Sequence, residues 1–463
     1  MNKISIDNII KATKGRLISP GKSQYIIGVK HDSRECEAGD MFVAVQGENQ
    51  DGHDYIPQVL KSGCRVFLVS HLGEWMDDVE KAGGTIICVG DTVYAMGQLA
   101  KEYLETLDAV KIAVTGSVGK TSVRDMVYYA LSERYICGRN VKNYNNDIGL
   151  PLSILKLDDT VEVVVLEIGM DKFGEIDRLG EIIKPHIAII TNIGVSHIEN
   201  LGSREGIFKA KMEIAPHITP REDQKGTLIF ARDDMLIRER ITGDYAQLSV
   251  GTSNDDDYVI SKVDDRGIEG IEFSLEHCGK FHRINLPVPG QHNAINSALA
   301  IAAGQLLGVE VETAIEGLCK TQLTGRRLNH LSGKSVQIID DTYNASPTSM
   351  KSALKVLENS SGGCRKVAIL GDMYELGQDS DSLHHTVGEF AAGLHIDLLI
   401  ALGQNAESIV KGCQGGDLKV RHFKKKGELY EAFDKLIEPG DMIMVKGSRG
   451  MKMEEVVEKL LEY

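Results

Sequence analysis

The segment from Val110 to Thr121, V-K-I-A-V-T-G-S-V-G-K-T, constrains the fold of this chain more than any other. An apolar run typical of a buried strand ends in a glycine-rich turn, and Lys120 and Thr121 then begin a predicted helix. Backbone N–H groups of such a turn point at phosphate oxygens, the lysine offsets their charge, and the threonine hydroxyl reaches Mg²⁺. The usual G-x-x-x-x-G-K-[ST] spacing would place glycine where Val114 stands, and Gly116 is displaced along the loop. We therefore predict a variant phosphate loop.

Composition limits the possible architectures and partners. At about 150 residues per domain, 463 residues predict about three domains. The formal net charge of -15 weighs against nucleic acid or an anionic membrane as the main partner. The eight cysteines include no C-x-x-C pair, which indicates reduced residues and no zinc or redox chemistry. The chain has no signal-like N-terminus and no apolar run of spanning length, so we expect a soluble, cytoplasmic protein.

Short β-branched runs alternate with longer helical patterns, which predicts α/β layers. We expect three domains, and the boundaries that the pattern favours are 1–107, 108–323 and 324–463. The expected strands are 41–45, 65–70 and 85–89 in the first, 161–168 and 187–191 in the second, and 336–340, 366–370, 398–402 and 442–445 in the third. Helices are expected at 95–107 and 293–307. The second segment should form a parallel, phosphate-loop ATPase-like sheet, and the third a Rossmann-like sheet.

Polar residues follow several of the expected parallel strands, at the edge where α/β sheets bind ligands. Glu167 closes one strand, and Asn192 and His197 follow the next. With Thr121 they offer oxygen and imidazole ligands to a nucleotide-bound divalent cation. Taken alone, Glu167 is equally compatible with a strand-end carboxylate and His197 with a surface or capping histidine.

Two further sequence stretches give only weak evidence of a ligand site by themselves. In G-Q-H-N-A-I-N, Asn293 and Asn296 would share one side of a helix, although asparagine near a helix start is usually a cap. D-D-T-Y-N-A-S-P, which covers residues 340–347, is also compatible with a simple strand-to-turn transition.

Taken together, these motifs resemble those of the Mur ligase family, ATP-dependent amide-forming ligases of peptidoglycan precursor synthesis. T-G-S-V-G-K-T is similar to the family's phosphate loop, G-Q-H-N-A-I-N to its H-N-x-x-N motif, and G-R-R at 325–327 to its arginine motif. Further segments resemble the members that join D-Ala-D-Ala to UDP-N-acetylmuramoyl-tripeptide: H-D-S-R, D-G-H, N-Y-N-N-D-I-G-L-P, L-G-D-M-Y-E-L-G and V-K-G-S-R. The resemblance covers nearly the whole chain.

The resemblance implies a role for each matching residue at the nucleotide. Lys120 and Thr121, with the loop residues Gly116, Ser117, Val118 and Gly119, would hold the phosphates of ATP. Thr121, Glu167, His197 and Lys211 would surround two Mg²⁺ ions, with Lys211 carbamylated into an anionic ligand. The alternative for Lys211 is an ordinary exposed lysine. Asn293 would contact adenine, Arg326 the phosphates, and Asp341 and Asn344 would position the nucleotide from the third domain.

The resemblance also implies where the other substrates bind. The uridine diphosphate end would lie in the N-terminal domain, on Asp32, Ser33, Arg34, Gln46, Gly47, Asn49, Asp51, Gly52 and His53. The acceptor peptide would lie along Asn143, Asn145 and Asn146. Ser346 stands where the family's commoner D-D-x-Y-N-A motif continues with asparagine, which affects only fine contacts of the dipeptide. We expect a monomer that acts on these substrates through an acyl phosphate.

Three other functions share part of this pattern. Other ligases of the superfamily, such as the diamino-acid-adding ligase or folylpolyglutamate synthase, share the phosphate loop, but the H-D-S-R and D-G-H segments disfavour the folate enzyme. A GTPase would need an N-K-x-D motif, and none follows the phosphate loop. A non-catalytic UDP-sugar-binding module is disfavoured by the set of Lys120, Glu167 and His197.

Overall fold

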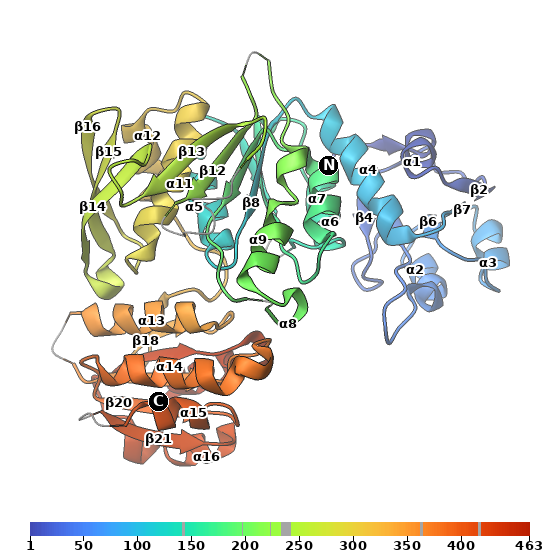
Figure 1. Cartoon of the computed structure of the whole chain (residues 1–463). Coiled ribbons are helices and arrows are strands. Elements are labelled where there is room, and N and C mark those ends of the chain that lie inside the picture. The colour runs from blue at the N-terminus through green and yellow to red at the C-terminus, as the bar shows by residue number, and fades with distance from the viewer. Residues whose placement is uncertain (141–143, 197, 223, 233–241, 362–363, 415–417) are drawn as a thin grey trace.

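A computed structural model describes residues 1–463 except 141–143, 197, 223, 233–241, 362–363 and 415–417. Three large sheets follow one another along the chain, as the α/β prediction requires. In Figure 1 the first segment is blue and lies beside the central segment, and the third, in orange and red, lies below it. The expected domain boundaries at 107 and 323 fall between the elements of successive sheets and stay a prediction.

The first sheet has the order β2-β7-β6-β5-β4, and only β2 runs antiparallel to its neighbour. Its strands are β2 (Arg16–Ser19), β4 (Gly28–Lys30), β5 (Asp40–Val43), β6 (Val66–Val69) and β7 (Thr85–Cys88), with β1 (Ile4–Ser5) and β3 (Tyr25–Ile26) paired apart. Its helices are α1 (Ile6–Thr13), α2 (Ile56–Lys61), α3 (Met76–Lys81) and α4 (Thr92–Thr106). β5 and β6 are buried throughout, which explains their continuous apolar sequence.

The central sheet has the order β16-β15-β14-β13-β12-β11-β8-β10-β9. Strands β8 to β14 pair in parallel, and β15 and β16 extend the sheet beyond β14 as antiparallel strands that the sequence did not reveal. The strands are β8 (Val110–Thr115), β9 (Cys137–Arg139), β10 (Val163–Glu167), β11 (Ile187–Ile190), β12 (Thr227–Ala231), β13 (Ala246–Gly251), β14 (Tyr258–Asp265), β15 (Ile271–His277) and β16 (Lys280–Leu286). The carboxyl ends of β8, β10 and β11 therefore meet at one edge.

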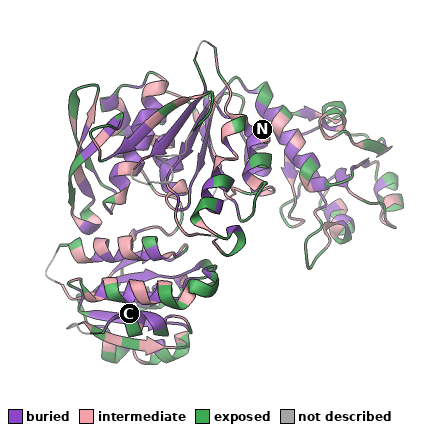
Figure 2. Cartoon of the chain, in the orientation of Figure 1, coloured by how far each residue is buried: buried purple, intermediate pink, exposed green. Residues whose placement is uncertain are grey.

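Helices cover both faces of the central sheet, and its inner strands β10, β11 and β12 are buried throughout, as the purple arrows at the centre of the sheet in Figure 2 show. They are α5 (Lys120–Ser132), α6 (Gly149–Ile154), α7 (Glu175–Ile183), α8 (Ile198–Leu201), α9 (Arg204–Met212), α11 (His292–Leu306) and α12 (Val311–Leu318). One core lies beneath α5, α11 and α12. The other includes α4, so it joins the first segment to the central sheet, and Tyr103 Oη on α4 donates to the carbonyl of Leu157 at 2.7 Å.

The third sheet has the order β17-β18-β22-β19-β20-β21, parallel except for β17. Its elements are β17 (Asn329–Ser332), β18 (Gln337–Asp341), α13 (Pro347–Asn359), β19 (Lys366–Gly371), α14 (Ser380–Ala392), β20 (Leu398–Leu402), α15 (Glu407–Gly412), β21 (Lys419–Phe423), α16 (Lys426–Glu431), α17 (Phe433–Leu436), β22 (Met442–Lys446) and α18 (Glu454–Glu462). The strands predicted in this segment are confirmed. Within the described part of the chain, no helix is both long and apolar enough to span a bilayer.

A contact between the central and third segments lies at the β14–β15 turn. The turn, η3 (Gly267–Glu269), meets the C-terminal end of α13, where the backbone N–H of Ile268 donates to Ser360 Oγ at 3.2 Å. Ser361 Oγ also donates to Glu269 Oε1 at 2.6 Å. These bonds help to hold α13 opposite the central sheet, as Figure 1 shows.

Candidate active site

The glycine-rich loop joins β8 to α5 at the carboxyl edge of the central sheet. Val114 is a buried residue of β8, so the position that glycine occupies in the commoner loop belongs here to the strand. Gly116 has a φ of 148°, and a Cβ on it would lie 1.9 Å from Thr191 Oγ1. Gly119, the N-cap of α5, has a φ of 84°. The path of the loop therefore requires glycine at both positions.

Two residues that follow β11 hold this loop in place through hydrogen bonds to its backbone. Asn192 Oδ1 accepts a hydrogen bond from the backbone N–H of Val118 at 3.0 Å, and Asn192 Nδ2 donates to the carbonyl of Val118 at 2.9 Å. Thr191 Oγ1 donates to the same carbonyl at 2.6 Å. The backbone N–H of Ser117 donates to the carbonyl of Asn192 at 3.0 Å. The loop is thus fixed before any phosphate binds.

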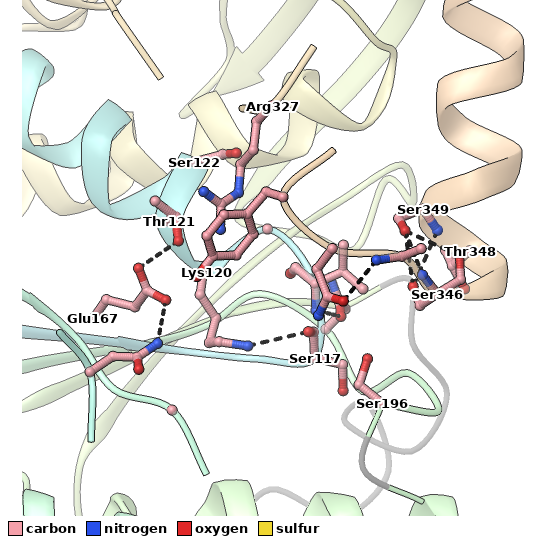
Figure 3. Close-up of a pocket in the computed structure, with 18 of the residues that line it drawn as sticks. Ser117, Lys120, Thr121, Ser122, Glu167, Ser196, Arg327, Ser346, Thr348 and Ser349 are labelled. Atoms are coloured by element: carbon pink, nitrogen blue, oxygen red, sulfur yellow. Dashed lines mark hydrogen bonds between the residues drawn. The ribbon is translucent and has the colours of Figure 1, made fainter. Parts of the chain in front are cut away.

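Thr121 and Glu167 lie together beside the loop, from α5 and the end of β10. Thr121 Oγ1 donates to Glu167 Oε2 at 2.6 Å, and Asn145 Nδ2 donates to Glu167 Oε1 at 2.8 Å (Figure 3). Lys120 Nζ donates to the carbonyls of Gly116 and Ser117 at 2.9 and 3.3 Å. Burial lowers the pKa of Lys120, and the charge of Glu167 opposes that shift. The oxygens of Thr121 and Glu167 are ligands of the kind that Mg²⁺ prefers.

The loop opens into a pocket of about 660 Å³ that the central and third segments line together. Its wall includes most of the residues predicted to bind nucleotide or acceptor: Ser117, Val118, Gly119, Lys120, Thr121, Asn145, Asn146, Glu167, Asn293, Asp341 and Asn344. Asn296 Nδ2 donates to Asn293 Oδ1 at 2.8 Å, so the two asparagines share one side of α11. Ser346 caps α13 and lines the pocket with Ser349 (Figure 3). Residues far apart in sequence therefore form one site.

Sequence reasoning missed some lining residues. Lys446 is buried at the end of β22, and its Nζ donates to Asp341 Oδ2 at 2.6 Å and to the carbonyl of Asn344 at 2.8 Å. His292 precedes Asn293, and burial lowers the pKa of its ring to about 4, so the ring is neutral at pH 7. Lys446 could have been predicted from its position in V-K-G-S-R, where it ends an expected strand.

The structure brings Arg327, and not the predicted Arg326, to the pocket. Arg327 lines the pocket and lies over the ring of Tyr343, with its guanidinium carbon 3.8 Å from the ring centroid. Arg326 instead contacts Asp340 Oδ2 at 3.3 Å and Glu458 Oε1 at 3.4 Å, away from the phosphate loop. The motif G-R-R contains two adjacent arginines, and spacing alone does not decide which one faces the ligand.

Lys211 on α9 is not an exposed lysine, because only 1% of its surface is accessible. Burial lowers the pKa of its amine well below the usual value, and the charge of Lys120 adds to this shift. Lys211 does not line the pocket at the phosphate loop. The predicted ligand His197 and the predicted acceptor contact Asn143 lie outside the described residues.

The residues predicted to bind the uridine diphosphate end lie in the segments that follow β4 and β5 of the first sheet, and none of them lines the pocket. Asp32 and Arg34 form an ion pair at 2.6 Å, and Arg34 holds the pKa of Asp32 well below its usual range. Gly52 packs on the backbone of Val45, where a Cβ would lie 2.7 Å from the nitrogen. The other predicted residues on this sheet are Ser33, Gln46, Gly47, Asn49, Asp51 and His53, and the structure does not bring them to the phosphate loop.

Asp51, His53 and His71 gather three potential metal ligands on this sheet. His53 Nε2 accepts a hydrogen bond from the backbone N–H of Ser70 at 3.0 Å, so Nδ1 carries the proton and donates to Asp51 Oδ1 at 2.6 Å. Burial lowers the pKa of His53, which favours this neutral ring. Both ring nitrogens are engaged, so the cluster is a hydrogen-bond network and not a metal site.

Three family models match the chain in order. The Mur ligase family catalytic domain matches residues 25–104, the Mur ligase middle domain residues 114–304, and the Mur ligase glutamate ligase domain residues 326–449. A relative from Bacillus subtilis named UDP-N-acetylmuramoyl-tripeptide--D-alanyl-D-alanine ligase is 38% identical, covering 100% of this chain and 99% of that protein. The Escherichia coli protein of the same name is 31% identical over 100% and 99%.

Solved structures agree with this result. A crystal structure of MurF from Acinetobacter baumannii matches with a TM-score of 0.90 at 32% identity, covering 100% of both chains. MurF ligase from Thermotoga maritima in complex with ADP matches with a TM-score of 0.81 at 28% identity, covering 94% of this chain and 97% of that one. With sequence identity extending over the whole length and a phosphate loop that opens into a pocket shared by two segments, this chain belongs to the Mur ligase family.

Proposed function

We propose that this protein is an ATP-dependent ligase that joins D-Ala-D-Ala to UDP-N-acetylmuramoyl-tripeptide. The observation that carries the proposal is full-length identity of 38% to a relative with that name. The pocket supports it physically, because a phosphate loop and residues of the third sheet face the same space. ATP is the nucleotide, in line with the MurF ligase solved in complex with ADP. The expected monomeric state and cytoplasmic location stay part of the proposal.

The reaction joins a carboxylate to an amine, which needs activation in water. A carboxylate oxygen of the tripeptide attacks the γ-phosphorus, the bond to the β-phosphate oxygen breaks, and ADP leaves. The dipeptide amine then attacks the carbonyl carbon of the acyl phosphate, loses a proton, and expels phosphate. Lys120 and Arg327 offset negative charge that gathers during the first step.

Thr121 and Glu167 fit a hard divalent cation by ligand type, because both offer oxygens, and their hydrogen bond keeps these oxygens together at the phosphate loop. We propose that they hold Mg²⁺, with His197 and Lys211 completing two sites. Bound Mg²⁺ would supply positive charge that lowers the barrier to phosphoryl transfer. Asn145 orients the Glu167 carboxylate through its hydrogen bond to Oε1.

Lys211 would serve as a ligand only as an anion. Burial lowers the pKa of this amine well below its usual value, which favours the neutral form, and a neutral amine reacts with CO₂ to form a carbamate and release a proton. A charged ammonium would instead be repelled by Lys120 and by any bound cation. We therefore propose that Lys211 is carbamylated. Lys211→Ala should lose ligation and regain part of it with added short carboxylates, while full activity without them would refute the modification.

The substrate ends would bind on different segments. Asp32, Ser33, Arg34 and the stretch 46–53 would hold the uridine diphosphate on the first sheet. Asn145 and Asn146, which line the pocket, would lie along the acceptor peptide. The dipeptide would lie against the third segment, near Ser346 and Asn344. Arg327 takes the phosphate-binding role first expected of Arg326.

A phosphate-release assay with matched substrate pairs tests this function. UDP-N-acetylmuramoyl-tripeptide, UDP-N-acetylmuramoyl-dipeptide and a folate are each offered D-Ala-D-Ala, L-Lys, diaminopimelate or L-Glu. We expect turnover only with the tripeptide and D-Ala-D-Ala, because a site built for the dipeptide leaves polar groups unpaired when a single amino acid binds. Preference for the UDP-dipeptide with a diamino acid, or for folate with glutamate, would assign the chain to another ligase of the family.

A further inference from the structure

A buried charged cluster lies beneath the phosphate loop, on the helix that follows it. Arg124 and Asp125 on α5 are both fully buried. Arg124 donates to Asp125 Oδ1 through Nε at 3.0 Å and through Nη2 at 2.6 Å. Arg139, at the end of β9, donates to the same oxygen at 2.7 Å. Both arginines therefore use one oxygen of Asp125, which leaves Oδ2 for another partner.

That partner lies 199 residues further along the chain. Asp125 Oδ2 accepts a hydrogen bond of 2.6 Å from the backbone N–H of Thr324. Thr324 belongs to the connector between α12 and β17, which is the stretch that joins the central sheet to the third sheet. A carboxylate on the helix of the phosphate loop thus holds the connector, through the strong type of bond that a charged acceptor makes.

The connector in turn reaches the pocket. The carbonyl of Thr324 accepts a hydrogen bond from Arg327 Nη1 at 2.8 Å. Arg327 lies over Tyr343 and lines the same pocket as Lys120 and Thr121, which are labelled with it in Figure 3. An unbroken series of contacts therefore runs from Asp125 through the Thr324 peptide to the arginine at the nucleotide site.

Asp125 also shares a helix face with a residue of the candidate metal site. Thr121 and Asp125 are four positions apart on α5, so they lie on the same side, one turn from each other. Thr121 contacts Glu167, and Arg124 Nη1 lies 3.5 Å from the same Glu167 oxygen. A shift of α5 at the phosphates would move Asp125, and with it the connector.

We propose that Asp125 is a positioning residue that sets the connector at Thr324 so that Arg327 reaches the phosphates of the nucleotide. This inference rests on the function proposed above. It predicts that nucleotide binding at α5 and the placement of the third segment are coupled through one hydrogen bond. Neutralising the buried charge of Arg124 is the competing role for Asp125, and it requires no contact with Thr324.

Asp125→Asn separates the two roles. The amide oxygen can still accept from Arg124 and Arg139 at the Oδ1 position, whereas the amide nitrogen would then face the Thr324 N–H, donor against donor. We expect MgADP, titrated calorimetrically, to bind at least about fivefold more weakly to this variant. Arg327→Ala should also weaken binding. The double variant should bind MgADP no more weakly than Arg327→Ala alone, because both changes remove the same contribution.

Thr324 offers a matched pair that leaves the buried cluster intact. Thr324→Pro removes the donating N–H, while Thr324→Ala keeps it. We expect the proline variant to reproduce the loss of Asp125→Asn and the alanine variant to bind MgADP as the wild type does. This pair tests the proposal even if Asp125→Asn fails to fold.

Two outcomes would overturn the inference while leaving the enzyme assignment in place. One is full additivity of Asp125→Asn with Arg327→Ala, which would make Asp125 a structural residue only. The other is equal MgADP affinity of the proline and alanine variants at Thr324. Failure of the wild-type protein to bind MgADP would overturn the proposed function itself, and the inference with it.

Discussion

Replacing Gly116 with alanine should disable the phosphate loop. An added Cβ would lie 1.9 Å from Thr191 Oγ1 and 3.0 Å from Thr191 Cβ, whereas unstrained carbon contacts lie at about 3.5 Å or more. The Thr191 hydroxyl donates to the carbonyl of Val118 at 2.6 Å, so turning it away breaks that bond. Either the loop or Thr191 must therefore move.

The size of the effect follows from the bonds that the movement breaks. They are the Thr191–Val118 bond and the two bonds between Val118 and the Asn192 side chain, each worth about 0.5 to 1.5 kcal/mol. Alanine at the positive φ of Gly116 adds about 1 kcal/mol. The variant loop relieves this strain by leaving the conformation that binds phosphate. If restoring that conformation costs about 3 kcal/mol, MgADP affinity falls about a hundredfold.

Isothermal titration with MgADP measures the loss, and Gly174→Ala is the control. Gly174 has a φ of 84°, but a Cβ on it meets no atom within 4 Å, and it does not line the pocket. The control should bind MgADP as the wild type does, since it carries backbone strain without the clash. Wild-type affinity in a folded Gly116→Ala variant would refute the reasoning.

Three further predictions concern the pocket. Lys120→Ala should lower ligation by about 10²-fold or more while the UDP substrate still binds, which phosphate release and calorimetry together would check; near-normal turnover would contradict it. Arg327→Ala should weaken MgADP binding and Arg326→Ala should not, because Arg326 pairs with Asp340 and Glu458; the reverse order would contradict the placement of the two side chains. His292 has a pKa of about 4 in the folded chain and about 6.5 unfolded, so the unfolded state binds more protons between these values and stability falls as pH drops below 6.5. At pH 5 this loss is about 2 kcal/mol, and urea unfolding should show the wild type losing about that much more stability than His292→Gln.

The sequence predicted much of the fold because buried parallel strands are short apolar runs with clear ends. β8, β10 and β11 were found in this way, and so was the edge where Thr121 and Glu167 meet. The parallel strands β12 and β13 were missed, and so were the antiparallel strands β14 to β16, whose alternating polar residues interrupt any continuous apolar run. Their pairing also depends on neighbours that a local pattern does not identify.

The parts of the candidate site that depend on long-range contacts could not be predicted from the sequence. Lys211 resembles a surface lysine in sequence, and only the packing of α9 makes it buried. The bond between Asp125 and Thr324 crosses 199 residues, so no local spacing predicts it. The choice between Arg326 and Arg327 likewise depends on the path of the connector. The sequence therefore predicted which residues carry the chemistry, but it did not predict which distant residues each of them contacts.

The most direct test of the acyl-phosphate reaction is to follow the carboxylate oxygen of the tripeptide into the products. UDP-N-acetylmuramoyl-tripeptide labelled with oxygen-18 in the reacting carboxylate is turned over with ATP and D-Ala-D-Ala, and the products are analysed by mass spectrometry. The account predicts ADP and one labelled oxygen in the released phosphate, because that oxygen leaves with phosphorus when the amine attacks. Unlabelled phosphate, or label in AMP, would contradict it.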